Sequence, residues 1–467
     1  MRALITPHVF AGTVRSPASK SHTVRRLLMA AFTREVSEIR YPLDSLDARS
    51  CLAVCRALGA AAEEYRSADT QNPNPPDARG NRLVCWTLRG TGGSSAFAAP
   101  PSPASSGLPL LDVGNSGTTL FLALAFAALG SGPVGFTGDE QIRRRSAAPL
   151  LDALSGLGVR VSSAPGGCAP ITLQGPWKGG RVRLPCPTSQ YLSALLLAAP
   201  LAPAGTLTEI EVPLLNERPY VELTLSYLDA QGIPYEAAAD FSQFRIPGGA
   251  VYKPMNGPVP GDFSSAAFPA CAGAISGGTL TLLGLERDDP QGDKAFFDML
   301  ARMGCEVSWE KSAPPAVPGA AGPPEWRLTL SRKGPLTGGE FDLNATPDLL
   351  PAMAVTAAFA RGKTALVNVA HARIKETDRI AVMAEELGKR GIKTEERPDG
   401  LIIHGAGDRP GPAIRGGAAD GHGDHRIVMA LAAAALGASG PLEIKDAESA
   451  AVTYPGFLEL LDAGISD

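Results

Sequence analysis

The hydrophobic pattern along the chain repeats six times. Each repeat opens with a short polar cluster and continues as an alanine- and leucine-rich segment in which nearly every position is apolar. These segments begin near Ser19, Asn115, Thr188, Asp262, Thr346 and Asp424. A helix that is apolar on all sides must be buried, so the pattern predicts six interior helices.

A second pattern accompanies each interior helix. A strand-like run generally follows, then a helix with a polar start and a leucine–glycine finish, then further short strands. The second helices include those predicted in residues 148–161, 220–233, 296–307 and 379–392. This order predicts a βαβ-type unit used six times, as an inside-out α/β architecture of two lobes with three units each. Chance similarity among alanine-rich helices is the alternative, and six occurrences with matching second helices argue against it.

Two stretches interrupt the repeat. Residues 91–107 and 312–325 are rich in proline, glycine, serine and alanine. Segments of this composition are typical of surface loops. We therefore predict insertions at the surface.

Composition narrows the class of protein. The chain has no run of 18 uncharged apolar residues, and its first residues lack the apolar core of a signal peptide, so we expect neither a membrane span nor secretion. Seven cysteines without metal-ligand spacing predict reduced thiols in the cytoplasm and no structural zinc. A net charge of −4 argues against nucleic-acid binding. Positive charge for anionic ligands must therefore be local.

The polar clusters are candidate anion sites because the first N–H groups of a helix lack partners inside it. Ser19, Lys20 and Ser21 open the first interior helix, with Arg25 one turn later on the same face. Residues 114–118, Gly-Asn-Ser-Gly-Thr, let the backbone approach a ligand closely, although a tight strand-to-helix turn explains the glycines nearly as well. For the cluster that opens at Thr188, helix capping alone is a sufficient explanation.

Charged clusters elsewhere give a stronger signal. Residues 143–145 are three arginines that we expect to open a second helix, where they oppose the helix dipole unless an anion is near. Lys375 and Arg379 stand four residues apart and repel each other on a helix unless Glu376 or Asp378 intervenes. A solvated helix end is the alternative in both cases. Residues 347–348 and 424–426 also open predicted helices, as ordinary aspartate caps do.

Taken in order, the motifs SKSHTVR, GNSGT, TSQYL, RPY, GDFSS, RIKETDR, GDHR and TYPGF resemble the 5-enolpyruvylshikimate-3-phosphate synthase family over nearly the entire chain. The resemblance implies a two-lobed inside-out α/β barrel of six βαβαββ repeats. One lobe comprises residues 1–19 and 260–467, and the other residues 20–259. It also implies transfer of the enolpyruvyl group of phosphoenolpyruvate to the 5-hydroxyl of shikimate 3-phosphate. No metal and no organic cofactor are implied, and we expect a monomer.

The resemblance assigns the site residue by residue. It implies that the catalytic residues are Asp348 as base, with Lys375, Glu376 and His425 as the proton shuttle and its neighbour. The implied ligands of shikimate 3-phosphate are Lys20, Ser21, Arg25, Thr188, Ser189, Gln190, Tyr220, Asp348, His371 and Lys375. The implied ligands of phosphoenolpyruvate are Lys20, Asn115, Gly117, Arg145, Gln190, Arg379 and Arg426.

Four positions depart from the family pattern. Phe121 and Val452 stand where an arginine and a lysine are usual, Glu217 replaces a serine, and His371 is a milder change. The losses at Phe121 and Val452 predict weak binding of phosphoenolpyruvate and weak inhibition by glyphosate, which occupies that site in the family. They also motivate a binding-only homologue as an alternative. The sister enzyme acting on UDP-N-acetylglucosamine is disfavoured, because no cysteine lies between Cys85 and Cys168.

Overall fold

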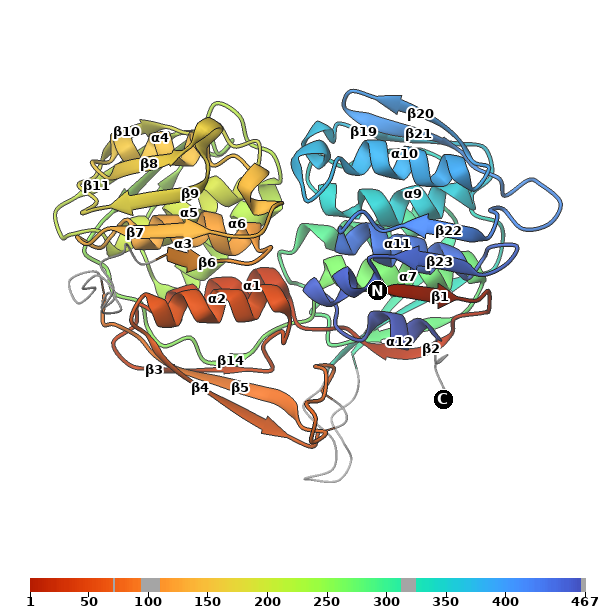
Figure 1. The fold of residues 1–467 in the computed structure, drawn as a ribbon, viewed down its shortest axis with the longest axis horizontal. Helices are drawn as coiled ribbons and strands as arrows, with labels where there is room; N and C mark the ends of the chain where they lie inside the picture. The colour runs from red at the N-terminus through yellow and green to blue at the C-terminus, as the bar shows by residue number, and fades with distance from the viewer. Residues whose placement is uncertain (70–71, 94–109, 312–324, 463–467) are drawn as a thin grey trace. The chain divides into compact units, whose positions relative to one another are not determined.

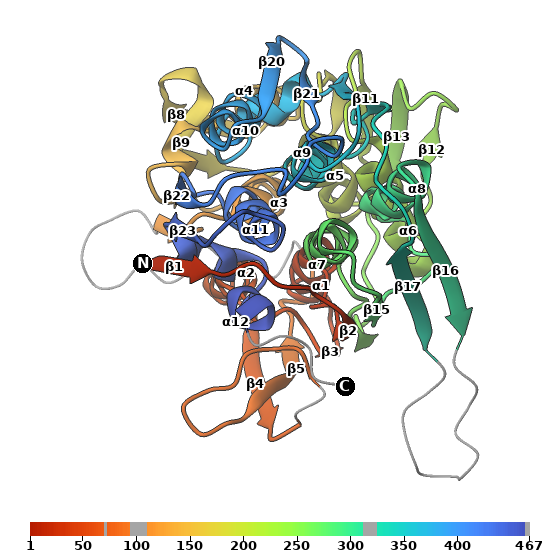
Figure 2. The same ribbon diagram turned by 90° about the vertical axis from the view of Figure 1, so that its right-hand side faces the viewer.

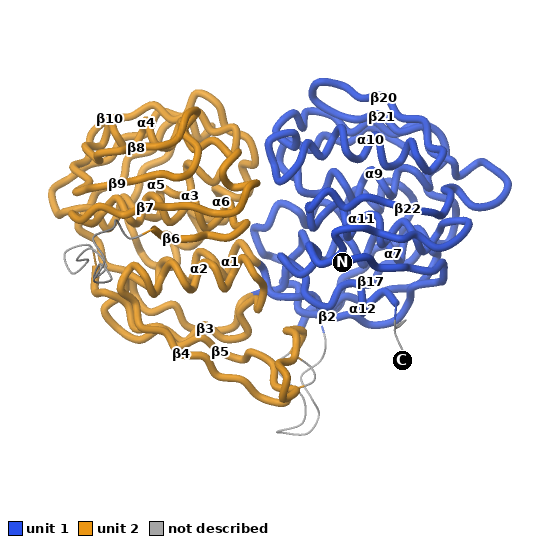
Figure 3. Tube along the Cα trace, viewed as in Figure 1, with its two compact units in different colours: residues 1–19, 260–467 blue, residues 20–259 orange. Residues whose placement is uncertain are grey.

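The computed structural model describes residues 1–69, 72–93, 110–311 and 325–462. The chain forms two compact units: unit 1 is Met1–Ser19 with Pro260–Asp467, and unit 2 is Lys20–Val259 (Figure 3). The insertions predicted at 91–107 and 312–325 lie almost wholly outside the described residues. No helix in the described ranges is long and apolar enough to cross a membrane.

Unit 2 contains three βαβαββ repeats, each with its own sheet. The first repeat formed by one continuous stretch of chain consists of β6 (Leu110–Asp112), α3 (Gly117–Ala127), β7 (Val134–Thr137), α4 (Ala148–Gly156), β8 (Arg160–Ala164) and β9 (Cys168–Gln174). Its strand order is β6-β7-β9-β8, with β6 parallel to β7 and the other pairs antiparallel. The next has the same order and consists of β10 (Gly180–Arg183), α5 (Ser189–Ala198), β11 (Leu207–Glu211), α6 (Arg218–Gln231), β12 (Glu236–Ala237) and β13 (Gln243–Pro247).

The remaining repeat of unit 2 takes its first strand from the end of the unit. It consists of α1 (Lys20–Ala30), β3 (Val36–Arg40), α2 (Leu46–Ala57), β4 (Ala61–Ser67), β5 (Arg82–Arg89) and the late strand β14 (Gly257–Pro258). Strand β14 pairs in parallel with β3, which gives the order β14-β3-β5-β4. The sheet is therefore closed by residues more than two hundred positions away from α1.

Unit 1 follows the same plan, but among the described residues the sheet of its last repeat has three strands instead of four. Its first repeat consists of β2 (Gly12–Arg15), α7 (Phe263–Ser276), β15 (Leu280–Leu283), α8 (Ala295–Arg302), β16 (Cys305–Lys311) and β17 (Trp326–Arg332). Its second repeat consists of β18 (Glu340–Asp342), α9 (Leu350–Ala358), β19 (Lys363–Val367), α10 (Arg379–Lys389), β20 (Lys393–Arg397) and β21 (Gly400–His404). Its third repeat consists of β22 (Gly417–Asp420), α11 (His425–Ala435), β23 (Leu442–Lys445), α12 (Phe457–Asp462) and β1 (Arg2–Ile5). The N-terminal β1 pairs antiparallel with β23, and β2 pairs in parallel with β15 (Figures 1 and 2). The N-terminus thus completes two sheets of unit 1.

The six predicted interior helices are confirmed. Every residue of α3, α9 and α11 is buried. In unit 1, α7, α9 and α11 pack against one another, and in unit 2, α3 packs against α1 and α5. The helices therefore form the core of each unit, as the apolar pattern requires.

Several polar clusters are helix caps. The side chains of Ser116, Thr188, Asp262, Asp378 and Asp424 each accept a backbone N–H at the start of α3, α5, α7, α10 and α11. A buried helix cannot leave these N–H groups to water, and a cap of this kind stabilises a protein by about 1 kcal/mol. The sequence interpretation as caps is confirmed for Thr188 and Asp424. It is wrong for Asp348, which lies inside the 3-10 helix Pro347–Leu349, where Thr346 holds the cap position.

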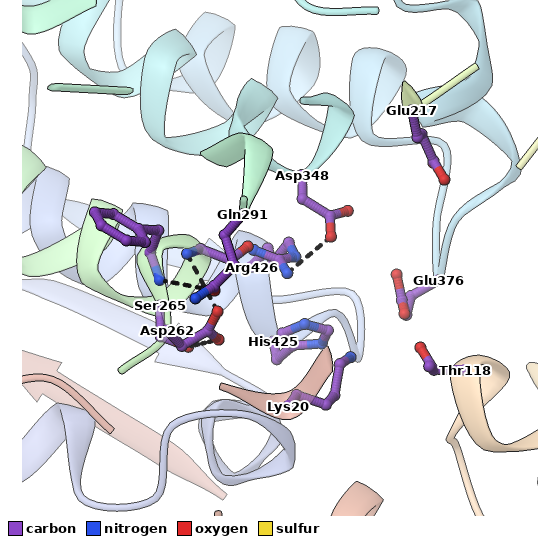
Figure 4. Close-up of polar contacts among 12 residues, drawn as sticks. Lys20, Thr118, Glu217, Asp262, Ser265, Gln291, Asp348, Glu376, His425 and Arg426 are labelled. Carbon is purple, nitrogen blue, oxygen red and sulfur yellow. Dashed lines mark hydrogen bonds and ion pairs between the residues drawn. The ribbon is translucent and has the colours of Figure 1, made fainter. Parts of the chain in front are cut away.

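The two points where the chain passes between the units lie side by side in unit 1. The N–H of Ser19 donates to the carbonyl of Pro260 and that of Asp262 to the carbonyl of Pro17, both at 2.8 Å. Asp262 also accepts the hydroxyl of Ser265 at 2.7 Å, while the Gln291 amide donates to the Gly261 carbonyl at 2.9 Å (Figure 4). These hydrogen bonds hold the two connecting segments, around Ser19 and Pro260, at the start of α7.

Candidate active site

In unit 2, a carboxylate lies at the N-terminus of α5. Oxygen Oε2 of Glu217 accepts the hydroxyls of Thr188 at 3.0 Å and Ser189 at 2.8 Å, and the backbone N–H of Ser189 at 3.0 Å. Glu217 is only 3% exposed. The positive end of the helix dipole stabilises such a charge. The predicted cluster at Thr188 and Ser189 is therefore a geometry that binds an anionic oxygen.

Arg25 crosses from α1 to α6 in the same region. Its guanidinium donates to the hydroxyl of Thr224 at 3.0 Å and to the carbonyls of Tyr220 at 3.2 Å and Ser21 at 3.0 Å. Burial lowers the pKa of Arg25 to about 10, so the side chain stays charged at neutral pH. The structure thus brings Ser21, Arg25 and Tyr220 together.

Lys20 is the first residue of α1. Its ammonium lies 3.2 Å from Asp47 on α2, and the Lys20 side chain is 15% exposed. This ion pair links the start of α1 to the first turn of α2. Asp47 had no place in the sequence-based site and is a partner that only the fold reveals.

The arginines at residues 143–145 do not open a helix, so that prediction is wrong. Ile142–Arg144 form a single 3-10 turn, and α4 begins at Ala148. The reason lies in Ser146 and Ala147: the Ser146 carbonyl accepts Tyr191 Oη at 2.5 Å, and the Ala147 N–H donates to Gly167 at 2.9 Å. These bonds hold the backbone in a non-helical path until Ala148.

Arg145 packs on the start of α3. A Cβ atom at Gly117 would collide with the Arg145 guanidinium, so the glycine makes room for the arginine. The guanidinium carbon lies 5.9 Å from the Phe121 ring centre, and Tyr191 meets that ring edge-on at 5.1 Å. Phe121, at the position of the missing arginine, is therefore an apolar support for Arg145.

Two amide side chains border this group. Gln190 donates to the Thr118 hydroxyl at 3.4 Å, which links α5 to α3. Asn115 donates to Gln141 at 2.9 Å and to Asp139, which ties the glycine-containing turn to the 3-10 turn. Gly117, Arg145 and Gln190 thus lie close together in unit 2. The hydrogen bonds of Asn115 stabilise the turn before Gly117.

In unit 1, one arginine is surrounded by carboxylates. Arg379, whose side chain is 1% exposed, binds Asp348 at 2.7 Å and Asp424 at 2.8 Å and also binds Glu376. Arg426 binds the other oxygen of Asp348 at 2.9 Å (Figure 4). Acids and cations from η6 (Pro347–Leu349), α10 and α11 therefore form one network.

The interpretation of residues 375–379 as one helical turn is wrong. Helix α10 begins at Arg379 with Asp378 as its cap, and Lys375 lies before it in extended backbone, after η7 (Ala370–Ile374). The argument from repulsion on a helix therefore does not apply, and burial of Arg379 excludes the solvated helix end. The expected neutralisation by Glu376 is confirmed.

The charges around Asp348 keep it ionised. Burial alone would raise the pKa of Asp348, but Arg426, Lys375 and Arg379 outweigh it and hold the pKa well below the ordinary value of 3.8. Burial likewise opposes the charge of Asp424, and Arg379 lowers its pKa in turn. The two carboxylates are therefore both held in the ionised form by neighbouring cations.

This depression has a defined pH dependence. A carboxylate with a lowered folded-state pKa stabilises the fold above its unfolded-state pKa, and the stabilisation is lost as the pH falls toward the folded-state value. We expect the difference in unfolding free energy between the wild type and Asp348→Asn to stay constant from pH 8 to 5 and to shrink only below about pH 4. Urea titrations at several pH values measure it, and a difference that disappears between pH 7 and 5 would contradict the assigned charge state.

The two predicted histidines are buried in unit 1. The His371 ring bonds the Asn344 carbonyl at 3.1 Å from η7. His425 begins α11, with its Nδ1 atom 3.9 Å from Asp424. Val452, the apolar departure, ends η8 (Ala447–Val452) and is partly buried.

Besides Asp47, sequence reasoning missed two participants in these clusters. Asp424 was assigned only a capping role, yet its carboxylate also binds Arg379 through two contacts. Glu217 was noted only as a lost serine. The signal that could have identified Asp424 is a buried arginine, since such a charge needs acidic partners.

The fold defined by these repeats is that of the enolpyruvyl transferases. A solved structure of EPSP synthase from Acinetobacter baumannii aligns over 99% of this chain and 98% of its own, with a TM-score of 0.76 and 27% identity. The family profile of EPSP synthase (3-phosphoshikimate 1-carboxyvinyltransferase) matches residues 6–82 and 92–461.

Curated relatives agree with this match. A 3-phosphoshikimate 1-carboxyvinyltransferase from Acetivibrio thermocellus is 44% identical over 96% of this chain and 95% of its own. The enzyme of the same name from Ruminiclostridium cellulolyticum is 43% identical over 96% and 94%. The chain belongs to the EPSP synthase family.

Proposed function

We propose that the chain transfers the enolpyruvyl group of phosphoenolpyruvate to the 5-hydroxyl of shikimate 3-phosphate and releases phosphate. Family membership gives the reaction. The observation that carries the proposal is the cluster of unit 1, in which Asp348 is kept ionised by Arg379, Arg426 and Lys375. An acid–base set of this kind has no use in a protein that only binds.

The reaction needs two proton transfers. In the addition step the 5-hydroxyl oxygen bonds to carbon 2 of phosphoenolpyruvate, Asp348 takes the hydroxyl proton, and the methylene carbon gains a proton from Lys375 or Glu376, next to His425. The product of this step is a tetrahedral ketal phosphate. In the elimination step the methyl group returns a proton to Lys375 or Glu376, and the C–O bond to phosphate breaks as the enol ether forms. The leaving phosphate takes the proton held by Asp348, which restores the starting state. General acid–base catalysis contributes typically 10²–10⁴-fold to such steps.

A low pKa has a cost for Asp348 as a base. A carboxylate stabilised by three cations accepts a proton less readily than an ordinary one. Holding the hydroxyl against the base therefore contributes much of the rate, through orientation rather than basicity. The ion pairs of Asp348 with Arg379 and Arg426 fix its position and support this role.

We assign ligand residues to the two substrates by the resemblance to the family. The proposed ligands of shikimate 3-phosphate are Lys20, Ser21, Arg25, Thr188, Ser189, Gln190, Tyr220, Asp348, His371 and Lys375. Phosphoenolpyruvate meets the amides and cations Lys20, Asn115, Gly117, Arg145, Gln190, Arg379 and Arg426. Charge-assisted hydrogen bonds of this type are the strong ones.

We further propose a cytoplasmic monomer that needs no metal or organic cofactor. All seven cysteines are free thiols, and five of them are buried. Unpaired thiols in this number suit a reducing compartment. Cationic side chains in both clusters supply the charge that two phosphate groups require.

The test is phosphate release by the purified protein. Phosphate should appear only when shikimate 3-phosphate and phosphoenolpyruvate are both present, at a rate proportional to enzyme concentration. Omitting either substrate should abolish it. Release from phosphoenolpyruvate alone, or none with both substrates, would refute the proposal.

The Val452→Lys variant should bind phosphoenolpyruvate more tightly. A lysine there adds one charge-assisted hydrogen bond, equivalent to about 10-fold or more in affinity. Glyphosate inhibition should strengthen in parallel, because both ligands are anions proposed to share this site. The measurements are KM for phosphoenolpyruvate and the inhibition constant of glyphosate.

The control is Val452→Leu, which changes size without adding charge and should alter neither constant. If Val452→Lys also leaves both constants unchanged, residue 452 does not face phosphoenolpyruvate, and the explanation of weak binding is wrong.

A further inference from the structure

The N-terminus of α5 already holds an anionic group supplied by the protein. One oxygen of Glu217 takes both hydroxyls of Thr188 and Ser189 together with the Ser189 backbone N–H, at 2.8 to 3.0 Å. Glu217 comes from the residue before α6, and it is almost fully enclosed at 3% exposure. Three donors converging on one oxygen is the arrangement by which proteins bind an anionic oxygen of a ligand.

We propose that Glu217 is a specificity-determining residue that competes with the phosphate of the acceptor for these donors. This inference rests on the proposed function, in which Thr188 and Ser189 bind the phosphate of shikimate 3-phosphate. A carboxylate and a phosphate repel each other and cannot accept from the same two hydroxyls at once. The phosphate reaches Thr188 and Ser189 only after the Glu217 carboxylate has moved away.

The competition changes which acceptor the enzyme favours. Each lost or displaced contact to a charged group reduces the advantage of having a phosphate on the acceptor. The same molecule without phosphate, shikimate, has no group that needs these donors and therefore loses nothing to Glu217. Glu217 thus lowers the preference for the phosphorylated over the unphosphorylated acceptor.

The other polar groups nearby fit this assignment. Arg25 and Tyr220 lie one layer away, where the guanidinium binds the Tyr220 carbonyl and the Thr224 hydroxyl, and Thr224 in turn donates to Ser193 at 2.8 Å. These bonds do not involve the Glu217 carboxylate, so we expect them to persist when Glu217 is replaced. A smaller side chain at residue 217 would therefore leave the hydroxyls of Thr188 and Ser189 available to a ligand, with the Arg25 guanidinium still nearby.

The experiment compares Glu217→Ser with the wild type, using shikimate 3-phosphate and shikimate as acceptors. The measured quantity is the ratio of kcat/KM for the two acceptors at saturating phosphoenolpyruvate. We expect Glu217→Ser to raise this ratio by at least about tenfold, since one charge-assisted hydrogen bond corresponds to roughly that factor. Because both acceptors are measured on the same preparation, partial misfolding cancels from the ratio.

Two further variants sharpen the result. Glu217→Gln keeps the shape and one accepting oxygen but removes the charge, and it should raise the ratio by a smaller factor. Glu222→Ser removes a carboxylate from the same helix, where it pairs with Arg218 at 3.0 Å in an exposed position, and it should leave the ratio unchanged. A ratio that stays the same or falls in Glu217→Ser would overturn the inference.

Direct binding separates this inference from the proposed function. Calorimetric titration with shikimate 3-phosphate needs no turnover, and Glu217→Ser should bind it at least about tenfold more tightly than the wild type. If phosphate is never released but this tightening is seen, the catalytic proposal fails and the inference stands. If the enzyme is active and Glu217→Ser binds equally or more weakly, the inference alone fails.

Discussion

The Asp348→Ala variant is expected to lose about 10²- to 10⁴-fold in kcat, the range typical of a missing general base. Its KM for shikimate 3-phosphate should change much less. The proton that Asp348 accepts moves in the transition state, so the lost interaction contributes little to binding in the ground state. Steady-state phosphate release over a range of both substrates measures the two constants.

A surface carboxylate provides the control. Asp408 pairs with Arg361 in an exposed position of unit 1, and Asp408→Ala should leave kcat unchanged. Glu376→Gln, which removes a proton donor while keeping its shape, should lower kcat in the same direction as Asp348→Ala. A kcat for Asp348→Ala close to that of the wild type would remove this residue from the role of base.

The Arg379→Met variant should have the largest effect on stability. Arg379 is the central cation for Asp348, Glu376 and Asp424, and its own pKa is raised because these acids outweigh the effect of burial. Removing one partner of a buried ionic network costs about 3–5 kcal/mol, because charges remain buried without compensation. Urea unfolding followed by circular dichroism at pH 7 measures the loss.

The pH dependence of this loss has a defined sign. Without Arg379, Asp424 loses the largest cause that lowers its pKa, so burial raises that pKa and the folded state binds a proton more tightly. The loss of unfolding free energy in Arg379→Met, relative to the wild type, should therefore be smaller at pH 5 than at pH 8. Arg397→Met removes an exposed pair with Glu395 and should cost less than about 1 kcal/mol. Equal losses in the two variants would contradict the buried network.

The interior helices were predictable because their signal is local. An apolar segment with a polar residue in front of it needs no knowledge of its partners, and the six helices lie where the pattern placed them. The strands β1, β2 and β14 give no comparable signal. They are two to four residues long, and each pairs with a segment far away in sequence, so that only the assembled sheets define them.

Residue type alone indicated only helix caps at residues 347–348 and 424–426, and the resemblance to the family placed Asp348 and Arg426 in the site. The ion pair between these two residues is visible only in the folded structure. At residues 143–145 the helix boundary is set by a bond to a distant backbone group, from Ala147 to Gly167. At residues 375–379 it is set locally, because Asp378 caps α10 and the helix begins only at Arg379. The role of Glu217 was missed because its donors lie 28 and 29 positions earlier in the chain.

The most direct test of the central claim is to follow phosphoenolpyruvate labelled with ¹³C at carbon 2 by NMR. With enzyme and shikimate 3-phosphate, the account predicts that the signal of phosphoenolpyruvate is replaced by that of an enol ether on the 5-oxygen. One phosphate should be released for each enol ether formed. Conversion of the label to pyruvate, or a signal that stays unchanged with both substrates present, would contradict enolpyruvyl transfer by this protein.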